Sequence, residues 1–241
     1  MNNEEQQTKH ECKILKKVKE ELNNNSKYII EMLDALTHNP KPNDFPDFIM
    51  PDGFLELFLV TSSTESKKKG AEHIKRQRMF ESRSNEIKEG LSDEDTFVRH
   101  MLPYSNNHSK ENLLKSCKKN IDTHIQKLKT YKGNKTHGIF LIEYNEESAL
   151  SMAEVISVSD VNHGEPKIFD HYVFSKDKDM LQLLNDYNEE IEFFIVSTKF
   201  NGTEVIKVRD IPNIIESLPY EYIVASNYGV VETEAWVKGK E

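Results

Sequence analysis

The chain has 241 residues, of which 30% are charged, and its formal net charge is −9 at pH 7. This length suits one domain with an insertion or two small domains, and the acidic balance excludes a broad, unfocused affinity for nucleic acid while leaving room for a local basic stripe. Two cysteines give no disulfide framework, and residues 1–19 lack the apolar core of a signal peptide. No segment approaches the ~20 apolar residues of a membrane helix. We therefore expect a cytoplasmic protein without a membrane partner.

The N-terminal part predicts helices and then a short strand. Within residues 13–36, apolar residues recur at the spacing of one helical face. The polar run at residues 23–26 interrupts this pattern, so we expect two helices or one broken helix, with Ser26 as the N-cap of the second. Pro40 and Pro42 end the helical pattern and lead into a strand over residues 45–50.

A single acidic residue marks the next strand, which spans residues 54–60. Glu56 is the only charged residue in this apolar run, and a strand that is apolar on both faces is normally buried in the middle of a sheet. An ionised carboxylate there without a partner would lose on the order of several kcal/mol of solvation. Three compensations stay open: a metal ion shared with a second carboxylate, a basic side chain, or protonation of Glu56.

The turn between the two strands decides whether a second carboxylate is near. Pro51-Asp52-Gly53 has the residue types of a tight turn, in which Gly53 would accept a positive φ. A two-residue loop sets Asp47 directly opposite Glu56, whereas a three-residue loop with a glycine bulge separates them. The sequence leaves both registers open.

Residues 62–108 are polar and charge-dense, and we interpret them as a helical insertion after the second core strand, with a helix over residues 71–88. Their basic residues form either a solvated helix face or an arm that contacts nucleic-acid phosphates. The candidates for the arm are Lys67, Lys68, Lys69, Lys75, Arg76 and Arg78.

The rest of the chain alternates helices and strands. Ser109 precedes a helix that runs to Leu128, and Lys118 lies at the margin of its apolar stripe. A buried strand at residues 138–144 follows, as in the crossovers of α/β folds. Further strands are expected at 153–158, 167–174, 191–200, 203–208 and 230–237, with helices at 177–187 and 212–218. We therefore predict a single α/β domain over residues 1–241, with a central mixed sheet flanked by helices.

This order of elements resembles the PD-(D/E)XK, or restriction-endonuclease-like, nuclease superfamily over roughly residues 10–200. The matching motif is Pro46-Asp47 followed by Glu56 on the apolar strand. The resemblance implies that Asp47 and Glu56 bind Mg²⁺ or Mn²⁺. The family has a lysine two positions after the glutamate, where this chain has Phe58.

Other residues would have to complete the family's site. The amine would come from another element, with Lys118 as the first candidate and the cluster Lys67, Lys68 and Lys69 as the second. A third carboxylate, which the family often has on its N-terminal helix, would be Glu31 or Glu21, although exposed helix surface explains both equally well.

Two function classes follow. The resemblance implies a magnesium-dependent nuclease that cleaves DNA phosphodiester bonds, in restriction, phage or mobile-element biology, with Asp47, Glu56 and Lys118 as catalytic residues. The alternative is a catalytically inactive nuclease-like fold that binds a protein partner. A homodimer stays open in either case.

Overall fold

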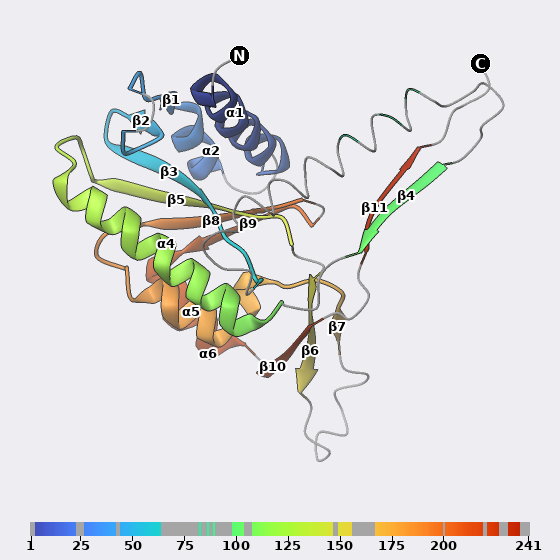
Figure 1. Cartoon of the computed structure of the whole chain (residues 1–241). Coiled ribbons are helices and arrows are strands. Elements are labelled where there is room, and N and C mark those ends of the chain that lie inside the picture. The colour runs from blue at the N-terminus through green and yellow to red at the C-terminus, as the bar shows by residue number, and fades with distance from the viewer. Residues whose placement is uncertain are drawn as a thin grey trace.

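The computed structural model describes residues 3–22, 27–41, 44–63, 82, 86, 89, 98–103, 108–146, 149–155, 167–199, 201–218, 221–226 and 231–236. Its centre is a six-stranded mixed sheet in the order β1-β2-β3-β5-β8-β9 (Figure 1). The strands are β1 (Thr37–His38), β2 (Phe48–Met50), β3 (Gly53–Leu59), β5 (His137–Tyr144), β8 (Phe193–Thr198) and β9 (Thr203–Lys207).

The strand directions explain the apolar runs. Strands β3, β5 and β8 are parallel neighbours, while β1, β2 and β9 pair antiparallel at the two sides. Parallel strands connected by helices are covered on both faces, so their residues are apolar in both directions. The predicted α/β class with a mixed central sheet is confirmed. The strands predicted at 191–200 and 203–208 appear as β8 and β9, which pair antiparallel, and Gly202 has a φ of 83° in the turn between them.

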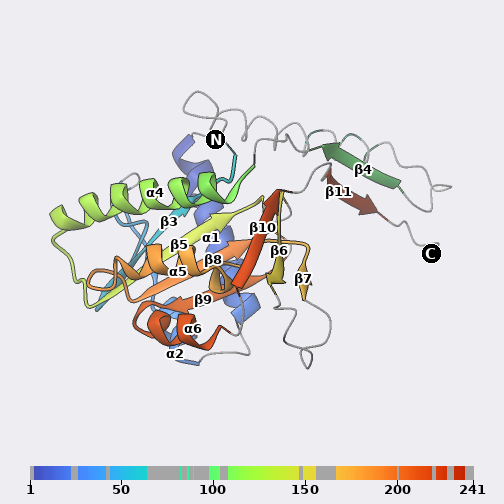
Figure 2. The same ribbon diagram turned by 90° about the horizontal axis from the view of Figure 1, so that it is seen from below.

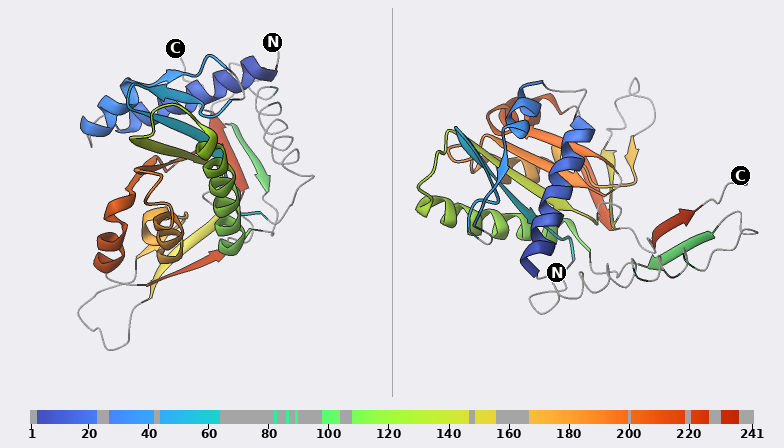
Figure 3. Two further views of the ribbon diagram at one scale, coloured as in Figure 1. Left: turned by 90° about the vertical axis from the view of Figure 1, so that its left-hand side faces the viewer. Right: turned by 90° about the horizontal axis from the view of Figure 1, so that it is seen from above.

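Helices cover both faces of this sheet (Figures 1 and 3). Ile139 and Leu141 of β5 belong to the cluster with α1 (Asn3–Leu22) and α2 (Lys27–Asp34). Phe140 and Ile142 belong to the cluster with α4 (Lys110–Thr130), α5 (Lys178–Asn185) and α6 (Ile211–Ser217). The alternation of side chains along β5 therefore separates the two cores.

The hairpin of β2 and β3 has a two-residue loop. Met50 pairs with Gly53 and Phe48 with Leu55, so only Pro51 and Asp52 lie between the strands. A positive φ is recorded for Gly202 and not for Gly53, so the expected role of Gly53 is wrong. Instead, a Cβ at Gly53 would lie 2.0 Å from the His137 backbone oxygen at the entrance of β5. Glycine permits this close approach of the two chains.

Two smaller sheets stand beside the central one (Figure 2). One has the order β10 (Glu221–Ser226), β6 (Leu150–Val155) and β7 (Ile168–Phe169), and the other pairs β4 (Val98–Pro103) with β11 (Val231–Trp236). Three sequence predictions are corrected here. The segment 62–108 contains strand β4, β10 was not expected, and the strand predicted over 167–174 is two residues long, because the chain bends and forms a 3-10 helix at Phe174–Lys176. The helix predicted over 71–88 lies almost entirely outside the described residues.

Candidate functional site

Asp47 and Glu56 lie side by side. Continuing the register of Phe48 and Leu55 by one residue puts Asp47 opposite Glu56. The backbone N–H of Asp47 donates to Glu56 Oε2 at 3.0 Å, and the backbone N–H of Leu57 donates to Asp47 Oδ2 at 2.8 Å. Each carboxylate is thus held by the backbone of the other strand. The tight-loop alternative left open by the sequence is the one that the hairpin adopts.

Helix α4 supplies the basic partners of Glu56, whose exposure is only 3%. Its Oε1 lies 2.6 Å from His124 Nδ1 and 3.5 Å from Lys127 Nζ. The His124 ring stacks on Phe58 with centroids 4.9 Å apart and 13° between the planes. His124 Nδ1 is buried and has no hydrogen-bond partner among the described residues. It lies close to the Glu56 carboxylate, but the N–H and the carboxylate oxygen are not aligned for a hydrogen bond. Of the three compensations considered from the sequence, a basic side chain is present in the structure.

The ionisation of Asp47 is strongly perturbed. Burial, followed by the nearby charge of Glu56, raises the pKa of Asp47 from 3.8 to about 7, against the opposing effects of the Leu57 N–H and Lys127. Two carboxylates in one partly buried place repel each other, so a proton or another cation stabilises the pair. The raised pKa is the electrostatic property expected of a site that accepts a positive ion.

A third acidic residue lies behind the pair. Glu11 of α1 is 5% exposed, and its Oε2 lies 2.9 Å from His38 Nε2 on β1. Its charge is one of the causes that raise the pKa of Asp47. The two acidic residues considered from the sequence lie elsewhere: Glu21 accepts from Thr203 Oγ1 at 2.6 Å, and Glu31 lies 3.7 Å from Lys27 Nζ.

The structure does not bring Lys118 to the carboxylate pair. Its ammonium lies 3.5 Å from Asp122 and 5.9 Å from the centroid of the Tyr187 ring, on the side of α4 that faces away from β3. The lysine that lies at Glu56 is Lys127, nine positions later. The residues proposed as a phosphate-contacting arm, Lys67, Lys68, Lys69, Lys75, Arg76 and Arg78, lie outside the described residues.

Sequence patterns could have indicated Glu11 and His124. Glu11 extends the buried stripe of Leu15, Val18 and Leu22 on α1 by one turn. His124 falls in the same way on the stripe of α4 that contains Cys117, Ile121 and Leu128. A polar residue at a position of the buried stripe faces the sheet. Lys127 lies three residues after His124, and residues three positions apart are neighbours on the surface of a helix.

The donor set suits a hard divalent ion in part. Mg²⁺ is commonly held by one or two carboxylates, with water completing its coordination. Asp47 Oδ1 accepts no hydrogen bond from the described residues, and Glu56 Oε1 faces a histidine nitrogen that lacks an aligned partner. No three His, Cys, Asp or Glu side chains in the described part of the chain form a ready ion-binding group. The residues therefore fit a two-carboxylate site and not a complete protein cage.

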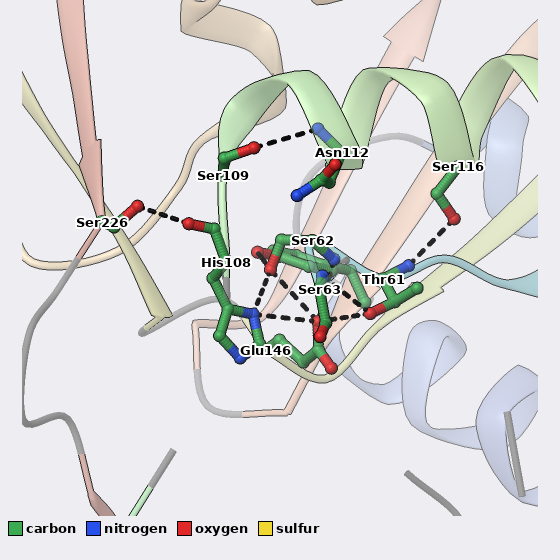
Figure 4. Close-up of polar contacts among 10 residues, drawn as sticks. Thr61, Ser62, Ser63, His108, Ser109, Asn112, Ser116, Glu146 and Ser226 are labelled. Carbon is green, nitrogen blue, oxygen red and sulfur yellow. Dashed lines mark hydrogen bonds and ion pairs between the residues drawn. The ribbon is translucent and has the colours of Figure 1, made fainter. Parts of the chain in front are cut away.

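A second polar cluster lies at the end of β3, beneath the first turns of α4 (Figure 4). Ser62 Oγ lies 2.7 Å from His108 Nδ1 and 3.1 Å from Glu146 Oε2, and Tyr144 OH donates to Ser62 Oγ at 3.2 Å. The serine and the glutamate approach the same imidazole nitrogen, since His108 Nδ1 is also 3.5 Å from Glu146 Oε2. In a Ser-His-acid triad the serine and the acid contact different ring nitrogens, so these contacts do not form a triad. They connect the chain after β3 with the chain at the end of β5.

Comparisons of the chain with protein-family models, curated proteins and solved structures found no match. Among the described residues, no helix has the length and apolar character needed to cross a membrane.

Proposed function

We propose that the chain is a divalent-metal-dependent nuclease that hydrolyses DNA phosphodiester bonds at Asp47 and Glu56. The observation that supports this most is the pair itself: two carboxylates of adjacent strands, one of them 3% exposed, are fixed side by side although they repel each other. Replacing a buried ionic group by an apolar residue is often neutral or stabilising, so the stability of the core alone does not require a carboxylate at position 56.

Each residue has a distinct task in this proposal. Asp47 and Glu56 would hold Mg²⁺ or Mn²⁺, and the His124 ring, which stacks on Phe58, would lie against the Glu56 carboxylate. When bound, the ion supplies Lewis-acid stabilisation of the phosphoryl charge and activation of water. Lys127 provides the amine that the family has two positions after its glutamate: its Nζ lies 3.5 Å from Glu56 Oε1, and its side chain is 46% exposed, so it can reach a substrate. Glu11 adds negative charge behind the site.

A second candidate function has its own support. The Lys127 ammonium already lies 3.5 Å from Glu56 Oε1 without any ion, and this is compatible with a catalytically inactive nuclease-like fold that binds a protein partner. In that case Lys127 is a structural counter-charge, and no residue of the pair needs to meet a phosphate.

Cleavage of DNA separates the two functions. We expect the wild type to cleave plasmid and linear DNA in the presence of Mg²⁺ or Mn²⁺ and not in EDTA. Lys127→Ala should lower the cleavage rate by about 10²-fold or more, since it removes a charge close to the reacting phosphate. Lys118→Ala is the matched control, because Lys118 lies on the same helix and pairs with Asp122. Equal activity of Lys127→Ala and wild type would exclude the assigned role of Lys127, and an inactive wild type would favour the binding module.

A further inference from the structure

Helix α4 and the loop after it are basic in an acidic protein. Residues 110–135 contain eight lysines and two acidic residues, whereas the whole chain has a net charge of −9. Seven of these lysines are exposed, namely Lys115, Lys118, Lys119, Lys127, Lys129, Lys132 and Lys135. Charge of one sign concentrated on one element creates a local field for an anionic partner even when the net charge is opposite.

The side of α4 next to β3 carries two exposed lysines. We call the side formed by Ser116, Lys119, Thr123 and Lys127 the β3 flank, because these residues are three or four positions apart and lie on one ridge. Ser116 Oγ accepts from the Thr61 backbone N–H at 3.1 Å, just beyond β3, and Lys127 lies at Glu56 of β3. No acidic residue of α4 belongs to this flank.

The opposite side of α4 carries Lys115, Lys118 and Lys129 together with Asp122. There Asp122 lies 3.5 Å from Lys118 and accepts from Tyr187 OH at 2.7 Å, next to α5. Lys119 follows Lys118 by one residue, about 100° further round the helix. Lys119 is exposed and has no ion pair with a described residue. Exposed positive charge therefore lies on both sides of α4, and the β3 flank is the side that leads to the Asp47–Glu56 pair.

We propose that a DNA strand runs along the β3 flank of α4, with its phosphates at Lys119 and Lys127, and so reaches the Asp47–Glu56 pair. This inference rests on the proposed nuclease function and names the path of its substrate. The two lysines are eight residues apart, or about 12 Å along the helix axis, which corresponds to roughly three to four nucleotides of one strand at 3.4 Å each. A polyanion with regularly spaced charges suits this arrangement better than an isolated anion.

Binding of DNA without metal tests the path independently of cleavage. Fluorescence anisotropy in EDTA would compare a fluorescein-labelled mixed-sequence DNA duplex on wild type, Lys119→Gln and Lys118→Gln. We expect Lys119→Gln to raise the Kd about 3- to 10-fold and to reduce the slope of log K against log salt by about 1, because one phosphate contact is lost. Lys118→Gln makes the same change of charge on the opposite side and should change the Kd less than about 2-fold.

The outcomes separate this inference from the proposed function. A selective loss of binding in Lys119→Gln supports the path, even if no DNA cleavage is found with Mg²⁺, in which case only the nuclease function fails. Equal effects of the two substitutions overturn the path, and so does a wild type that binds no DNA. Polyglutamate that competes as well as unlabelled DNA of equal charge would also overturn it, because the surface would then recognise an acidic peptide.

Discussion

Asp47 and Glu56 repel each other, and the energy of that repulsion depends on pH. The pKa of Asp47 is about 7 in the folded chain, whereas an unfolded aspartate has a pKa near ~3.9. As the pH rises, the unfolded state loses this proton first. The contribution of Asp47 to the free energy of unfolding therefore falls between about pH 4 and pH 7 and is constant above that range.

Asp47→Asn tests this ionisation directly. Asparagine resembles the protonated carboxyl and keeps an oxygen for the Leu57 N–H, so in EDTA it should raise the free energy of unfolding at pH 8 by about 2 kcal/mol. At pH 4 the gain should vanish. Urea denaturation at both pH values measures the difference. The exposed Asp44→Asn is the matched control and should show no such pH dependence, and a gain of equal size at both pH values would disprove the raised pKa.

The choice between Lys118 and Lys127 shows what sequence reasoning can and cannot do at the scale of single residues. The carboxylate pair was one of two alternatives from the sequence, because one acid in an apolar strand needs compensation and only the two-residue turn sets Asp47 directly opposite it. The amine could not be selected by its place at the margin of the apolar stripe, since Lys118 and Lys127 both lie beside that stripe. Their separation of nine residues matters only when α4 is placed against β3.

The elements explain why Lys127 reaches Glu56. A crossover helix runs back along its strand, so the start of α4 lies at the end of β3, where Ser116 meets Thr61. Glu56 is the fourth residue of β3 and therefore lies against the later turns of α4, which carry His124 and Lys127. The direction of the crossover was available from the sequence. Strand β1 could not be predicted in this way, because its two residues are too few to show a periodic pattern.

The hairpin register depends on Gly53. A Cβ there would meet the His137 backbone oxygen at 2.0 Å and Met50 Cε at 2.6 Å. Gly53→Ala should lower the free energy of unfolding by about 2–3 kcal/mol, because a backbone oxygen cannot move aside cheaply. Gly202→Ala has open space around its Cβ but a φ of 83°, so it should cost only about 1 kcal/mol. The urea denaturation midpoints of the two variants and the wild type measure these losses of stability. Equal losses in Gly53→Ala and Gly202→Ala would contradict the close approach of the two chains at Gly53.

The N-terminus of α4 gives another prediction for this element. Ser109 Oγ accepts from the Asn112 backbone N–H at 3.2 Å, which makes Ser109 the N-cap. Ser109→Ala should destabilise the chain by about 1 kcal/mol, whereas the exposed Ser217→Ala at the end of α6 should have little effect. The two thermal denaturation midpoints provide the measurement. No difference between them would mean that the cap contributes nothing to the docking of α4.

At the scale of the whole molecule, the six-stranded sheet was largely predictable and the smaller sheets were not. The runs in β3, β5 and β8 are long and apolar, and the Asn201-Gly202 turn fixes the position of β9. Strands β4 and β11 pair residues more than a hundred positions apart, for example Trp236 with Val98, and no local pattern contains this information. Strand β10 has the alternating exposure of a half-covered sheet, so its apolar signal is weak.

A titration with Mg²⁺ and Mn²⁺, followed by the thermal denaturation midpoint, tests the central claim that Asp47 and Glu56 form an ion site. An ion that binds only the folded state stabilises it by mass action, so the wild-type Tm should rise by several degrees as the ion reaches about 10 mM. The double variant Asp47→Asn, Glu56→Gln retains the size of both side chains and should show no rise. A wild type without a shift, or a double variant with the same shift, would contradict the ion site at this pair.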